Sequence, residues 1–178
     1  MGLIDTFRLL ELHTRPILWP GGGGYVPVEV RINGVGLIDR IREVQLPFAE
    51  MEYDRRVQAG ESPTELGPRG SLAGNYLYLP GNEVFLPSRN YLGQPFDHGF
   101  DCGADDSRTG KSLILMCTCG VTECWFLLCR IEEQGNEVVW SDFCQFHRDW
   151  TYDIGPFRFD RELYLAELSK GQMSPSPR

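Results

Sequence analysis

Three cysteines lie close together in the sequence and could bind a metal ion together. Cys117 and Cys119 are separated by one residue, so on a strand their thiols point to the same side. Gly120 permits a tight turn after them, and that turn would bring Cys124 alongside. Because thiolates are among the preferred ligands of zinc, the sequence makes zinc the candidate cofactor of this turn.

A fourth ligand is expected from residues that follow the next hairpin. His147 would complete a tetrahedral set with the three thiolates, and Cys144 is the alternative fourth ligand. The spacing is C-x-C, however, whereas the common zinc sites use C-x2-C pairs. The competing interpretation is that these cysteines are small buried apolar side chains, as we expect for Cys129 within its apolar run.

A second hypothesis makes one of these cysteines the nucleophile of a small enzyme. His147 would act as the base, and Asp142 or Asp149 would orient its imidazole ring. His98 lies in a loop rich in acidic residues and could join the same site, under a long loop at 58–74. This hypothesis predicts one concave pocket lined by these groups. The net negative charge of the chain works against it, because negative charge disfavours a thiolate.

Two glycine-containing segments resemble nucleotide-binding motifs but lack the residues that the motifs need. Residues 110–112 (GKS) match the end of a P-loop, yet Asp105 occupies the position of the required earlier glycine. Residues 34–36 (GVG) begin like a dinucleotide-binding fingerprint, yet Asp39 stands where the third glycine should be. Neither segment predicts a phosphate site.

The composition is that of a folded chain with an acidic surface. The 178 residues include 42% hydrophobic side chains and carry a formal net charge of -8. We expect a single α+β domain over residues 1–172 and a disordered tail over 173–178. The negative charge disfavours nucleic-acid binding and would attract a basic protein partner. No apolar run is long enough to cross a membrane and no export signal is present, so we expect a soluble, cytoplasmic protein with reduced thiols.

Alternation of apolar and polar residues predicts strands in the first part of the chain. We expect strands at 7–12 and 26–32, and the dipeptide at 33–34 (NG) predicts a turn after the second strand. Apolar residues at helical spacing then predict a short amphipathic helix over 37–44. Frequent glycines and prolines predict the long loop at 58–74.

The rest of the chain is rich in strand-like runs and ends with a helix. The runs lie at 76–79, 83–86, 113–116, 125–131 and 138–143. The first two are expected to form a hairpin, and the last two a second hairpin. Asp160 can cap a helix that extends to Leu168. We therefore predict an α+β fold, with a mainly antiparallel sheet and two short helices packed on one face.

The C-terminal third carries a pattern that resembles a family of uncharacterised bacterial proteins. The pattern is C-x-C-G at 117–120, C-W at 124–125, W-x-D-F at 140–143 and a histidine at His147. The resemblance implies a bacterial, cytosolic setting and no activity. Two functional hypotheses therefore stand: a soluble binding or interaction protein, with zinc in a structural role, or the small enzyme described above.

Overall fold

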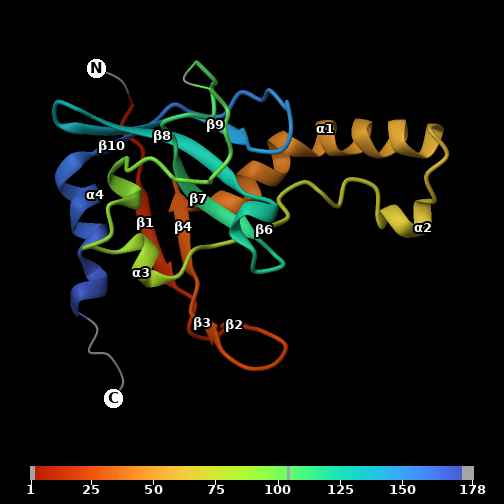
Figure 1. Cartoon of the computed structure of the whole chain (residues 1–178). Coiled ribbons are helices and arrows are strands. Elements are labelled where there is room, and N and C mark those ends of the chain that lie inside the picture. The colour runs from red at the N-terminus through yellow and green to blue at the C-terminus, as the bar shows by residue number, and fades with distance from the viewer. Residues whose placement is uncertain (1–2, 104, 174–178) are drawn as a thin grey trace.

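Buried apolar side chains alternate with more exposed ones along the first strands of the fold. In β1 (Phe7–Glu11), Phe7 and Leu9 are buried, and in β4 (Val28–Ile32) every second side chain is buried. The alternation places one face of each strand in the core. The computed structural model describes residues 3–103 and 105–173 and has the α+β fold that the sequence predicts, with antiparallel sheets (Figure 1).

In the described part of the chain, the strands form three antiparallel sheets. β1, β4 and β5 (Val35–Gly36) form one sheet, and the short strands β2 (Ile17–Leu18) and β3 (Gly24–Tyr25) form another. The largest sheet has the strand order β10-β9-β8-β7-β6. Its members are β6 (Tyr76–Leu77), β7 (Ser112–Cys117), β8 (Leu127–Gln134), β9 (Glu137–Gln145) and β10 (Phe157–Asp160).

The two larger sheets are joined at both edges. At one edge, the backbone N–H of Asp5 donates to the carbonyl of Arg158 in β10, 2.7 Å away. At the other edge, the N–H of Val28 at the start of β4 donates to the carbonyl of Leu79, 2.9 Å away, in the segment that follows β6. The core therefore lies between sheets that are linked on both sides.

Aromatic side chains dominate the core between these sheets. The ring of Phe7 lies 4.5 Å from that of Tyr164 and 5.6 Å from that of Trp140, measured between centroids. Trp140 Nε1 donates to the Tyr164 hydroxyl at 3.1 Å, and this hydroxyl donates to the carbonyl of Tyr91 at 2.6 Å. The polar atoms of these buried rings are therefore satisfied.

The first helix begins where the sequence predicts but continues much further. The turn at 33–34 is confirmed, since both of its residues have positive φ and it joins β4 to β5. The following helix, α1 (Leu37–Gln58), has 22 residues, so the prediction of a short helix is wrong in length. The apolar spacing fades after Val44, and contacts with distant residues stabilise the second half: Arg148 pairs with Glu52 at 2.8 Å.

The predicted loop at 58–74 contains a further helical turn. This helix, α2 (Pro63–Leu66), lies beside the outer end of α1, which extends away from the sheets (Figure 1). Arg69, within the same loop, pairs with Glu50 and Asp54 of α1, each at 2.8 Å. The loop therefore packs along α1 and stabilises it.

The predicted hairpin between 76–79 and 83–86 is wrong in its second strand. Only Tyr76 and Leu77 are assigned to a strand, and they pair with the end of β7. Residues Gly81–Val84 form the short helix α3, which begins directly after Pro80. The N–H of Phe85 donates to the carbonyl of Gly81 at 2.8 Å, so the segment closes a helical turn despite its apolar pattern.

The three strand-like runs of the second half are confirmed as β7, β8 and β9. Near Asp142, β9 has one residue more than the part of β8 that it pairs with, which is the definition of a β-bulge. Asp142 has a φ of 51° at this bulge. The sequence does not predict β10, because this strand is short and its last residue, Asp160, is also the cap of the next helix.

The C-terminal helix α4 (Arg161–Leu168) is also confirmed. Asp160 caps it by accepting a hydrogen bond from the N–H of Leu163 at 3.0 Å. The helix packs against β1, β9 and β10. The residues that the structure describes also form three short 3-10 helices: Asn90–Leu92, Thr122–Cys124 and Lys170–Met173. Met173, the first residue of the predicted tail, belongs to the last of them, and 174–178 lie outside the described residues.

None of the helices in the described part of the chain combines the length and the apolar character needed to cross a bilayer. α1 is long enough, but charged residues occur along its whole length.

Candidate metal centre

The end of β7 and two consecutive turns position the three cysteines that the sequence proposes as metal ligands. β7 ends at Cys117, whose carbonyl accepts a hydrogen bond from the N–H of Gly120 at 3.1 Å. The N–H of Cys124 donates to the carbonyl of Val121 at 3.2 Å and closes the second turn. Gly120 has a φ of +86°, and a Cβ there would lie 2.9 Å from the ring of Trp19, so this turn requires glycine.

The thiols of Cys117, Cys119 and Cys124 converge at the surface. Their sulfur atoms all lie within 4.8 Å of one another. A tetrahedral zinc ion with Zn–S bonds of about 2.3 Å separates its sulfurs by about 3.8 Å, so modest side-chain rotations would complete the geometry. Cys117 is buried, whereas Cys119 and Cys124 are exposed. The structure thus brings together three of the proposed ligands, with access from solvent.

Two of the thiols differ in how readily they lose a proton. Burial raises the pKa of Cys117 to about 11. Backbone hydrogen bonding at Val121 lowers the pKa of the exposed Cys119, and the neighbouring Cys117 thiol adds to this effect. Cys119 therefore supplies a thiolate to an incoming metal ion more readily than Cys117 does.

His147 lies beside the cysteine turn but outside the group of thiols. Its Nε2 is 2.7 Å from the carbonyl oxygen of Glu123, the residue that precedes Cys124. A hydrogen bond to a carbonyl requires the proton on this nitrogen, which then cannot bind a metal. Among the described residues, the ligand atoms that lie within 4.8 Å of one another come from the three cysteines, without His147 or Cys144. In this arrangement His147 orients the turn.

The other residues singled out in the sequence lie in different surroundings. Cys129 is fully buried in the core, as its apolar run predicts. Cys144 is half-buried in β9 and lines a cavity together with Lys111. His98 accepts a hydrogen bond from the N–H of Phe100 through Nδ1 at 3.1 Å, and this contact stabilises its own loop.

The groups of the nucleophile hypothesis do not form a hydrogen-bonded chain. Asp142 pairs with Arg130 at 3.0 Å, and Asp149 is exposed. Within the part of the chain that the structure describes, no hydrogen bond joins the His147 ring to a cysteine thiol. A catalytic cysteine would need such a base within reach.

Two further features were not expected from the sequence. The guanidinium of Arg148 lies 4.9 Å from the ring centre of Trp125 and pairs with Glu52, so the residue after Cys124 is linked to α1. A cavity of about 580 Å³ beside β9 is lined by Gln145 and Lys111, among others. In the sequence, Lys111 belongs only to the segment that fails to match a P-loop. Gln145 belongs to no motif that would predict a binding site.

Comparisons with models of known protein families, with curated proteins and with solved structures found no match.

Proposed function

We propose that this protein binds zinc through Cys117, Cys119 and Cys124, and that the metal stabilises the turn from 117 to 125 for contact with a partner protein. The proposal rests on one observation: three sulfur atoms from a short segment lie within 4.8 Å of one another. Zinc prefers thiolate ligands in tetrahedral arrangements, and three thiols in one small volume meet most of that requirement.

The fourth coordination position would face solvent in this proposal. Cys119 and Cys124 are exposed, and Val121 between them is 57% exposed. A water molecule or a side chain of the partner would complete the tetrahedron. The formal net charge of -8 favours a basic protein as that partner.

A metal site made of thiols requires a reducing environment. All six cysteines of the chain are free thiols, and a thiol must remain reduced to bind a metal. Together with the resemblance to bacterial proteins, this supports a bacterial cytoplasm as the proposed location.

Zinc analysis of the purified chain tests the proposal. Protein purified with a reductant and without chelator should contain a single zinc ion per chain. Cobalt added to the metal-free protein should give the near-ultraviolet absorption of thiolate-to-metal charge transfer. Cys119→Ser and Cys124→Ser should each remove most of the zinc, and both sites are exposed, so the fold should tolerate the change.

Cys102→Ser is the matched control, because Cys102 is a free cysteine outside the group of converging thiols. It should retain the full zinc content. A metal-free wild-type protein that also fails to take up cobalt would refute the proposal, and so would equal zinc content in all three variants.

A further inference from the structure

A cavity of about 580 Å³ lies beside β9, apart from the cysteine turn. Its walls come from the loop before β7, from the end of β9 and from the segment at 148–152. This volume falls in the range of about 300–1,000 Å³ that is typical of small-molecule sites. The aromatic side chains of Trp150 and Tyr152 line it together with several charged groups.

Lys111 lines this cavity as a buried cation. The residue is only 4% exposed, and it forms no ion pair within the described residues. Its ammonium group acts on the thiol of Cys144: burial raises the pKa of that thiol, and Lys111 offsets part of the rise. The chain has only one other lysine, Lys170, which pairs with Glu167 at 2.6 Å. A buried, unpaired lysine is costly, and an anion would relieve that cost.

Gln145 provides a second, independent indication of a ligand. It is fully buried at the end of β9, and it lines the same cavity. Neither its amide nitrogen nor its amide oxygen has a hydrogen-bond partner among the described residues. Buried side-chain amides are normally hydrogen-bonded, so rotation of this side chain toward the cavity would let it bind a polar group of a ligand.

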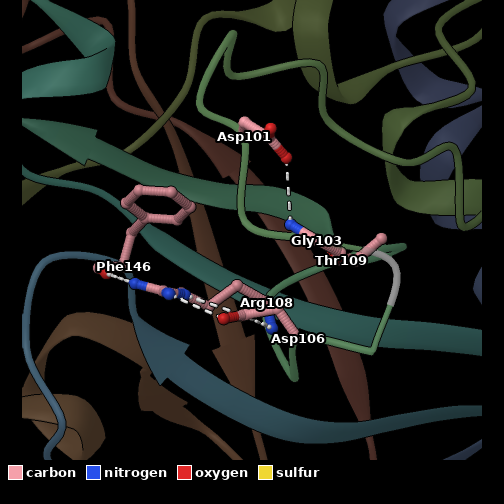
Figure 2. A network of polar contacts seen from close by, with 6 residues as sticks. All are labelled: Asp101, Gly103, Asp106, Arg108, Thr109 and Phe146. Atoms are coloured by element: carbon pink, nitrogen blue, oxygen red, sulfur yellow. Dashed lines mark hydrogen bonds and ion pairs between the residues drawn. The ribbon is translucent and has the colours of Figure 1, made fainter.

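The arginines around the cavity already have partners. Arg108 donates to Asp106 through two nitrogens, at 2.6 and 2.7 Å, and Figure 2 shows its guanidinium extending from Asp106 to the Phe146 carbonyl. Arg130 pairs with Asp142, and Arg148 pairs with Glu52. These pairs hold the walls in place, and Lys111 remains as the cation that can bind a ligand. Asp149, which is exposed at the rim of the cavity, carries a negative charge that opposes the binding of an anion.

We propose that this cavity binds a small molecule through an anionic carboxylate or phosphate group. Lys111 pairs with the anion, and the Gln145 amide donates a hydrogen bond to it. Trp150 and Tyr152 pack against the remainder of the molecule. This site is independent of the metal centre, and either can exist without the other.

Calorimetric titration of the wild-type protein with inorganic phosphate and, separately, with citrate tests the proposal. At least one probe should bind with a saturable signal, and the probe that binds identifies the anionic group. Lys111→Met should weaken that binding by roughly tenfold or more, the loss expected when one hydrogen bond to a charged group is removed. Gln145→Leu should weaken it as well. Lys170→Met changes the net charge equally but lies outside the cavity, so it should bind like wild type.

Amine acylation of the wild-type protein, read by mass spectrometry, gives a test that needs no variant. The bound probe should slow the modification of Lys111 and leave that of Lys170 unchanged. Three results would overturn the proposal: no saturable binding of either probe, equal weakening by Lys111→Met and Lys170→Met, or equal modification rates of Lys111 with and without the probe.

Discussion

At the scale of single residues, the buried thiol of Cys117 makes metal binding depend on pH. Burial raises its pKa to about 11, so at neutral pH the thiol holds a proton that a metal ion must displace. Each displaced proton changes the apparent affinity by about tenfold per pH unit. Zinc affinity should therefore rise as the pH increases from about 6 to about 8.

Competition with a chromophoric chelator at several pH values measures this affinity, once the protonation of the chelator itself is taken into account. Proton release on zinc addition, followed in weakly buffered solution, provides a second readout. Cys102→Ser should show the same pH dependence as wild type. An affinity that stays constant over this range would mean that no protonated thiol, Cys117 included, binds the metal.

At the scale of elements, the sequence predicts best the strands and helices whose stability is local. β8 and β9 contain continuous apolar runs and form a hairpin with each other, and α4 has its own cap. α1 was predicted too short because distant residues, such as Arg148, stabilise its second half. The apolar residues Val84 and Phe85 predict a strand where the structure has the short helix α3. Contacts between distant parts of the chain do not appear in local patterns.

The cap of α4 gives a prediction at this scale. Asp160→Ala should lower the free energy of unfolding by about 1 kcal/mol, because the N–H of Leu163 loses its hydrogen-bond acceptor. Urea denaturation followed by circular dichroism measures the change. Asp160→Asn is the matched control, since asparagine is an equally good cap and should retain most of the stability. Equal destabilisation by both substitutions would show that the carboxylate charge, and not the cap, matters.

At the scale of the whole molecule, one buried carboxylate links the two ends of the chain. Glu167 accepts hydrogen bonds from the N–H of Leu9 at 2.9 Å, from Arg8 at 2.8 Å and from Lys170 at 2.6 Å. Burial raises its pKa, but the hydrogen bonds from Lys170, Leu9 and Arg8 outweigh burial and lower the pKa overall. Glu167 therefore contributes stability above its unfolded-state pKa, and this contribution is lost as the pH falls through its folded-state pKa.

Glu167→Gln should lower the free energy of unfolding at neutral pH by about 1–3 kcal/mol, since the hydrogen bonds then reach a neutral group. The difference between variant and wild type should shrink as the pH falls through the acidic range. Urea denaturation at a series of pH values checks both statements. Glu162→Gln, an exposed change on the same helix, is the control and should have little effect. A difference that persists unchanged at low pH would contradict this account.

The candidate sites divide in the same way between local and long-range features. The convergence of Cys117, Cys119 and Cys124 could be predicted, because the three residues belong to one short segment with a glycine turn. The cavity at Lys111 and Gln145 could not, because it forms where the loop before β7 meets the end of β9. Lys111 and Gln145 are 34 positions apart in the sequence, and neither belongs to a motif that predicts a binding site.

The link between Asp5 and Arg158 has a consequence for protein synthesis. A ribosome makes Asp5 first, and Arg158, whose backbone carbonyl pairs with it, emerges much later. The nascent chain must keep its N-terminal segment unpaired at this edge until then, because pairing between distant segments comes late in folding. A chain stalled before residue 158 would leave that edge exposed to other strands.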